Sequence, residues 1–209
     1  MYHLYIKLEY TTIMYDITFI QPSTFLMVGG TGSGKTTLCS KIVANKKILF
    51  DRPPKYTILC YSQMQPLYTE MYNRGDLDLL IEGYPSFEKI TELVKPYKSE
   101  GSILIFDDGL TGMAKDNSMA KDITRIFYEL SSHQNVSTFF LCQNLFYANK
   151  EFRTLSLNSK YIFIFKNPVS FGKKTLKTII NLLSFNCSVM VDKYELLLSS
   201  ILHIVVSGL

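Results

Sequence analysis

The most constraining stretch of the sequence is FLMVGGTGSGKTTLCS, residues 25–40, which contains the spacing G-x-x-x-x-G-K-T. An apolar run precedes the glycines and a segment with helical spacing follows them, so the pattern predicts a strand, a phosphate-binding loop and a helix in succession. Glycines let successive backbone amides point at phosphate oxygens, and the helix N-terminus adds partial positive charge. A glycine-rich turn that matches by chance is the alternative, which the flanking elements disfavour.

The individual positions of this motif have expected roles. Lys35 is expected to reach the β- and γ-phosphates as a catalytic group, and the Thr36 hydroxyl is expected to ligate Mg²⁺. The residues expected to bind the nucleotide are Gly29, Gly30, Thr31, Gly32, Ser33, Gly34, Lys35, Thr36 and Thr37.

The rest of the chain predicts an α/β fold. Five short runs are apolar on both parities, as in strands buried on both faces of a parallel sheet: 24–28, 56–62, 102–108, 137–144 and 161–167. Stretches with helical spacing lie between them, at 36–45, 86–97 and 117–131. Strands that alternate with helices predict a mainly parallel sheet flanked by helices. We expect one or two strands in residues 1–20, a core at 21–172 and a less patterned extension at 173–209.

Two acidic residues, Asp107 and Asp108, end the third apolar run. A strand of this kind delivers a carboxylate to the sheet edge beside the phosphates. Asp107 is expected to hold Mg²⁺ through water, and Asp108 is expected to act as general base on the attacking water. Gly109 lets the backbone turn there. In the alternative interpretation, Asp108 only caps the following turn.

Polar and basic residues further along complete the predicted site. The fourth run ends in Gln143, a catalytic candidate for sensing the γ-phosphate or orienting water; alternatively it only begins a loop. Arg153 is the first candidate for an arginine finger supplied by a neighbouring subunit, and Arg125 is the second. Either arginine alternatively forms a surface ion pair.

Composition restricts the class of protein. The 209 residues are 47% hydrophobic and 19% charged, which fits a chain with a buried core rather than a disordered one. The net charge of +4 permits nucleic-acid binding without arguing for it. We expect no signal peptide, because Lys7, Glu9 and Asp16 interrupt the apolar start, and no membrane span, because the apolar end is shorter than the ~20 residues that a span needs. We expect a reducing compartment without disulfides or zinc, because the cysteines are widely spaced. They are Cys39, Cys60, Cys142 and Cys187.

Several related classes of nucleotide-binding protein are disfavoured. A guanine-specific N-K-x-D motif is missing, since "ANKK" at Ala44 lacks the aspartate, and "LSSHQ" at Leu130 lacks the glycines of a transporter signature. A nucleotide kinase usually carries an arginine-rich lid and needs no second acid. ATP hydrolysis that drives motion remains.

The stretch SSHQNVSTFFLCQNLFYANKEFRTLSLNSKYIFIFKNP, residues 131–168, resembles one family closely in "CQNLF", "RTLSLNS" and "FKNP". Together with "IEGYP" at Ile81, it is similar to the genome-packaging ATPases of double-stranded DNA viruses and virus-like transposons of the Polinton and adintovirus kind. These are related to the poxvirus packaging ATPase and belong to the FtsK–HerA superfamily of P-loop ATPases. The resemblance covers residues 25–168, about two thirds of the chain.

This resemblance implies a RecA-like additional-strand core with strand order 5-1-4-3-2, ATP and Mg²⁺ as cofactors, and a homo-oligomeric ring. It further implies translocation of double-stranded viral DNA into a capsid at a portal vertex, inside the infected host cell in the nucleus or a viral factory. Lys150, Lys173 and Lys174 are expected to contact DNA phosphates; in the alternative interpretation they are only solvated surface residues. The alternatives are a P-loop nucleotide kinase and an inactive ATP-binding assembly subunit.

Overall fold

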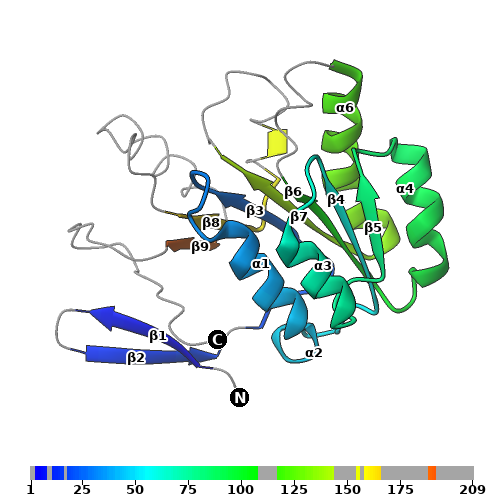
Figure 1. Cartoon of the computed structure of the whole chain (residues 1–209). Helices are drawn as coiled ribbons and strands as arrows, with labels where there is room; N and C mark the ends of the chain where they lie inside the picture. Colours follow the sequence, from blue (N-terminus) through cyan, green and yellow to red (C-terminus); the bar gives the residue numbers. More distant parts are fainter. Residues whose placement is uncertain are drawn as a thin grey trace.

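A computed structural model of the chain describes residues 3–8, 11–16, 18–107, 117–143, 154–155, 158–165 and 188–191. Within them, β1 (His3–Leu8) and β2 (Thr11–Asp16) pair as a small antiparallel sheet, inside the stretch where one or two strands were expected. The other strands form one seven-stranded parallel sheet in the order β5-β4-β6-β7-β3-β8-β9 (Figure 1). The domain boundaries expected from the sequence stay a prediction.

The inner part of the large sheet is the one predicted from the apolar runs. The strands are β3 (Thr24–Val28), β4 (Tyr56–Tyr61), β5 (Leu79–Glu82), β6 (Ser102–Asp107), β7 (Val136–Cys142), β8 (Tyr161–Ile164) and β9 (Ser188–Val191). The predicted runs correspond to β3, β4, β6, β7 and β8, and their predicted order 5-1-4-3-2 is confirmed. The prediction lacked β5 and β9, which add one strand at each edge.

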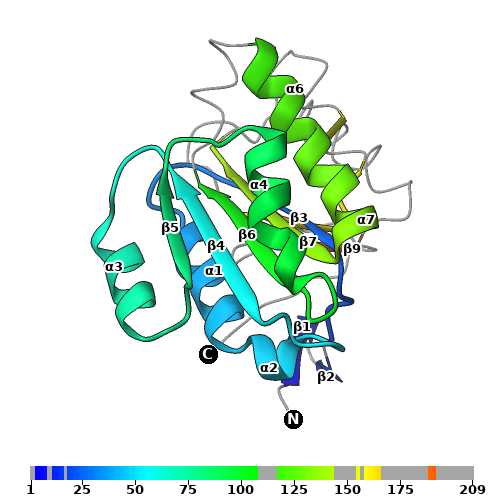
Figure 2. The same cartoon turned by 90° about the vertical axis from the view of Figure 1, so that its right-hand side faces the viewer.

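Helices cover both faces of this sheet (Figure 2). One face is covered by α1 (Lys35–Ala44), α2 (Lys46–Leu49) and α3 (Pro66–Asn73). The other face is covered by α4 (Phe87–Val94), the 3₁₀ turn η1 (Lys95–Tyr97), α6 (Asn117–Arg125), the π-helical segment η2 (Ile126–Leu130) and α7 (Ser131–Gln134). The three predicted helices are present, whereas α2 and α3 were not predicted. None of the helices in the described part of the chain is both long and apolar enough to cross a lipid bilayer.

The alternation of side chains along β6 divides the core into two layers. Ile103 and Ile105 pack into the layer beneath α1, α2 and α3, whereas Leu104 and Phe106 pack into the layer beneath α4 and α6. All four are fully buried, and burial of such a side chain contributes roughly 1.5–3 kcal/mol. Because successive side chains alternate across a strand, Asp107 shares the face of Ile105 and lies on the α1 side.

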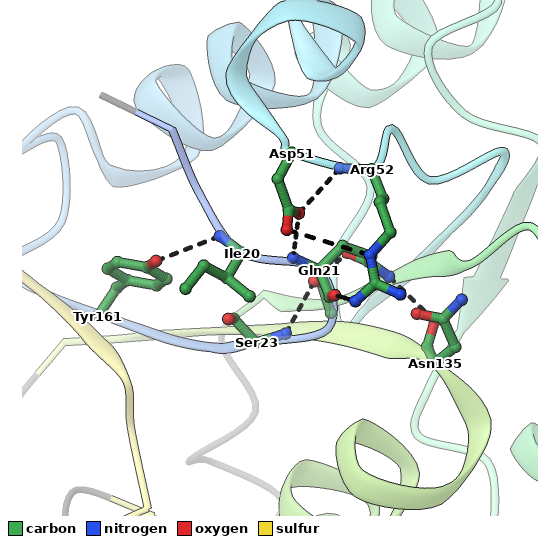
Figure 3. A network of polar contacts seen from close by, with 8 residues as sticks. Ile20, Gln21, Ser23, Asp51, Arg52, Asn135 and Tyr161 are labelled. Atoms are coloured by element: carbon green, nitrogen blue, oxygen red, sulfur yellow. Dashed lines mark hydrogen bonds and ion pairs between the residues drawn. The ribbon is translucent and has the colours of Figure 1, made fainter. Parts of the chain in front are cut away.

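A buried polar cluster, which we call the Gln21 network, lies at the amino ends of β6 and β7. The Gln21 amide nitrogen donates to the carbonyl oxygens of Asn135 (2.9 Å) and Ser102 (3.3 Å), and the Ser137 hydroxyl donates to its amide oxygen. The Gln21 backbone N–H donates to the Asp51 carboxylate at 2.7 Å (Figure 3). Gln21 is fully buried, so these contacts join the segment before β3 to the two central strands.

Candidate nucleotide-binding site

The glycine-rich loop begins where three parallel strands end together. The Gly29 N–H donates to the Cys142 carbonyl oxygen at 3.1 Å, and the Phe165 N–H donates to the Val28 carbonyl oxygen at 2.8 Å. A Cβ atom at Gly29 would lie 2.5 Å from the Phe165 Cβ and 2.8 Å from the Ser33 Oγ. The first glycine of the motif is therefore required by space, because the loop passes directly against the end of β8.

The last glycine of the loop sets the start of α1. Gly34 precedes the helix with φ 96°, a left-handed conformation that side chains rarely adopt. Lys35 and Thr36 are thus the first residues of α1, at the end of the helix where the unpaired backbone amides carry partial positive charge.

The Lys35 ammonium folds back over the loop. It donates to the carbonyl oxygens of Gly29 (2.7 Å) and Gly30 (2.9 Å), and Lys35 is only 8% exposed. The Ser33 hydroxyl is also buried, and it has no hydrogen-bond partner among the residues that the structure describes. A buried cation and an unpaired hydroxyl within one loop fit an anion that offers several acceptor oxygens.

The carboxylate of Asp107 lies beside this loop. Its Oδ2 atom accepts hydrogen bonds from the Thr36 hydroxyl (2.8 Å) and from the Tyr68 hydroxyl (2.7 Å), and Asp107 is 4% exposed. A hydrogen bond to a charged group contributes roughly 1.5–3 kcal/mol. Thr36 and Asp107, which the sequence assigned to the metal, are therefore in direct contact. Hydroxyl and carboxylate oxygens are the ligands that Mg²⁺ prefers, so these residues fit that ion.

Sequence reasoning missed two tyrosines at this site. Tyr68 belongs to α3 and is 1% exposed; burial, together with the negative charge of Asp107, raises its pKa well above the ordinary tyrosine value. Tyr84 follows β5, and its hydroxyl donates to the main-chain oxygen of Asp107 at 2.6 Å. Tyr84 lies in the "IEGYP" stretch quoted for the family resemblance, but nothing in the sequence connected either hydroxyl with Asp107.

Solved structures of known proteins share this arrangement of elements. The cytoplasmic domain of EssC matches with a TM-score of 0.59 at 12% identity over 83% of this chain. EssC (ATPases 2 and 3) from Geobacillus thermodenitrificans matches with a TM-score of 0.57 at 13% identity over 83% of this chain. The cytoplasmic domain of the type VII secretion ATPase EccC from Thermomonospora curvata matches with a TM-score of 0.51 at 10% identity over 79% of this chain. The matched regions are 37%, 38% and 22% of those chains, respectively. No family model and no curated protein matches.

The chain has the P-loop NTPase fold. The likeness to these neighbours, at 10–13% identity, is one of fold.

Of the other residues predicted to act in catalysis or to contact DNA, some are described by the structure and some are not. Gln143 directly follows β7, whose last residue, Cys142, pairs with Val28 in the parallel register. Gln143 is therefore at the same sheet edge as the P-loop, with an exposed side chain. Asp108, Arg153, Lys150, Lys173 and Lys174 lie outside the described residues, and their roles stay predictions.

Arg125, the second candidate for the arginine finger, is engaged within its own chain. Its guanidinium lies 3.3 Å from the Glu129 carboxylate and 3.9 Å from that of Glu88. It also lies 4.0 Å from the centre of the Phe87 ring. The contacts with Glu88 and Phe87 join α6 to α4, and the ion pairs match the alternative interpretation of this residue as part of a surface ion pair.

Proposed function

We propose that this chain is an ATP-hydrolysing motor subunit that moves double-stranded viral DNA into a capsid. The observation that carries the ATPase part is the 2.8 Å hydrogen bond from the Thr36 hydroxyl to Asp107, on a P-loop whose lysine is buried. It places a threonine hydroxyl and a carboxylate side by side at the start of α1. The DNA-packaging part is supported by the sequence resemblance over residues 131–168.

In this proposal each residue of the nucleotide site has one role. The loop amides and Lys35 bind the phosphates of ATP, and Thr36 and Asp107 hold the metal ion, directly and through water, respectively. Bound Mg²⁺ would supply neutralisation of charge on the phosphate oxygens. Asp108 takes a proton from the attacking water, and Gln143 orients that water. Arg153 reaches the γ-phosphate bound by a neighbouring subunit, so the site is completed only in the ring.

The first test measures ATP hydrolysis by the purified chain with and without duplex DNA. We expect hydrolysis that duplex DNA stimulates, with no phosphoryl transfer to nucleosides. Transfer to a nucleoside would indicate a nucleotide kinase. A chain that binds ATP but hydrolyses none, with or without DNA, would instead be the assembly subunit.

Two substitutions separate binding from chemistry. Lys35→Ala should abolish ATP binding, because the loop loses the ammonium that lies over it. Asp108→Asn should leave ATP binding intact and abolish hydrolysis, because an amide does not take up the proton of water. If Asp108→Asn still turns over ATP at the wild-type rate, Asp108 is not the general base.

Mixing variants tests the shared site. Arg153→Ala retains a complete P-loop and Lys35→Ala retains Arg153, so each alone should be inactive. In a mixed ring, an Arg153 from the Lys35→Ala subunit completes the site of its neighbour, and part of the activity returns. Arg125→Ala is the matched control and should keep most of the activity, because Arg125 pairs with Glu129 in its own chain. Mixtures without any recovered activity would contradict the arrangement in trans.

A further inference from the structure

Two hydroxyl groups from different helices converge on one oxygen atom of Asp107. Thr36, on α1, lies 2.8 Å from Oδ2, and Tyr68, on α3, lies 2.7 Å from the same atom. The threonine belongs to the expected nucleotide motif. The tyrosine belongs to no motif, yet it makes an equally short bond to the same atom.

The packing of α3 fixes where the Tyr68 hydroxyl lies. Tyr68 and Met71 are the buried residues of that helix, each 1% exposed, and both lie in the core layer shared with α1. The Tyr68 ring is 5.5 Å from the ring of Tyr61, at the end of β4. A tyrosine held in this way has little rotational freedom, so its hydroxyl is a donor with a fixed position.

The Tyr68 hydroxyl remains a donor in the folded chain. A tyrosine hydroxyl is ordinarily protonated at neutral pH, and that of Tyr68 donates to the Asp107 Oδ2 atom at 2.7 Å. A carboxylate otherwise rotates readily about its last bond, because that torsion has broad minima. The orientation of Asp107 is therefore determined by the donors around it.

We propose that Tyr68 is a positioning residue whose hydroxyl holds the Asp107 carboxylate against Thr36, in the orientation that receives the Mg²⁺–nucleotide complex. The inference rests on the proposed function in assuming that this complex is the ligand. Tyr68 acts through Asp107 and touches neither the nucleotide nor the reacting atoms. Partners of this kind around a metal ligand typically change metal affinity or activity by about 10–100-fold when they are removed.

The test uses Tyr68→Phe, which keeps the ring and removes only the hydroxyl. The readout is the Mg²⁺ concentration that gives half-maximal enhancement of binding of a fluorescent ATP analogue. We expect this concentration to rise about tenfold, while binding of the analogue in EDTA stays at the wild-type level. Tyr61→Phe is the matched control, a buried neighbouring tyrosine, and should leave the Mg²⁺ requirement unchanged. An unchanged or lowered requirement in Tyr68→Phe overturns the proposal.

A double-mutant cycle separates positioning from a general structural role. Asp107→Asn alone should raise the Mg²⁺ requirement, and adding Tyr68→Phe to it should change nothing further, because the two residues act as one unit. A further tenfold rise in the double variant would show that Tyr68 acts by another route and overturn the proposal. These measurements read binding, so they remain decisive if the wild-type chain hydrolyses no ATP, the result that would contradict the proposed function instead.

Discussion

Gly29 is constrained by its neighbour rather than by its backbone angles. Its φ is not positive, but a Cβ at this position would lie 2.5 Å from the Phe165 Cβ. The atom that it would meet is present in every residue except glycine, so shortening Phe165 does not make room. The requirement for glycine at the start of the loop thus comes from Phe165, a residue distant in the sequence that directly follows β8.

Gly29→Ala should therefore lower the free energy of unfolding by about 1–3 kcal/mol and weaken ATP binding, because the loop has to shift away from β8. Gly75→Ala is the matched control, since Gly75 has φ 76° and a Cβ added there would meet no atom within 4 Å; only backbone strain of about 1 kcal/mol is expected from it. The check is thermal denaturation with ATP titration. The Gly29→Ala, Phe165→Ala double variant should be no more stable than Gly29→Ala, and recovery would contradict the steric argument.

Thr36 offers a second test at this scale. Thr36→Val keeps the shape of the side chain but removes the donor to Asp107, so Mg²⁺-dependent hydrolysis should fall by at least about tenfold. Thr36→Ser retains the hydroxyl and should retain most of the activity. Equal rates in the two variants, measured at saturating ATP, would argue against a role for the hydroxyl.

The contact between Thr36 and Asp107 was predictable from the sequence, whereas the tyrosines were not. A P-loop fixes where Thr36 lies, and an apolar run that ends in an acid fixes where Asp107 lies, so both reach the same sheet edge. Tyr68 reaches Asp107 only through the packing of α3 on α1. Such a contact between segments distant in sequence leaves no local pattern.

Among the elements, the short ones at the sheet edge were missed. β5 has only four residues, Leu79–Glu82, all partly exposed or exposed, so it lacks the continuous apolar run that revealed the inner strands. α3 has eight residues and buries only Tyr68 and Met71, which is too few to establish a helical period. The inner strands, including the four-residue β8, were predicted well because burial on both faces gives each of them a continuous apolar run.

The start of α4 gives a prediction for one element. The Ser86 hydroxyl accepts a hydrogen bond from the Lys89 N–H at 3.3 Å and caps the helix. Ser86→Ala should cost about 1 kcal/mol of stability, and for a chain of this size that lowers Tm by about 2–4 °C. Ser86→Asp, an equally good cap with a charge suited to the helix N-terminus, should restore Tm. A lower Tm for aspartate than for alanine would contradict the capping role.

Across the whole molecule, the two ends of the parallel sheet have separate roles. The P-loop and Asp107 lie at the carboxyl ends of the strands, and the Gln21 network lies at the amino ends of β6 and β7. Substitutions at the amino end should therefore change stability without changing nucleotide binding by the folded chain.

Gln21→Leu tests this separation, because leucine keeps the volume and removes every hydrogen bond of the side chain. Two carbonyl groups and the Ser137 hydroxyl each lose one hydrogen-bond partner, although the Asn135 carbonyl keeps the Ser102 N–H and the Ser137 hydroxyl keeps the Ser23 N–H. We therefore expect a loss of about 2–4 kcal/mol and a Tm lower by about 5–10 °C. ATP affinity below the transition should equal that of wild type. Gln65→Leu places the same change at an exposed position and should stay within about 0.5 kcal/mol. A large loss of ATP affinity in Gln21→Leu would contradict the separation.

The central position of β3 has a consequence for synthesis of the chain. β3 lies between β7 and β8, and the loop that follows it is hydrogen-bonded to Cys142 and placed against Phe165. The nucleotide motif therefore leaves the ribosome long before the strands that give it shape. At ~5–20 residues per second, the delay is on the order of ten seconds. During that interval the nascent chain carries a complete nucleotide motif that is not yet seated between its neighbouring strands.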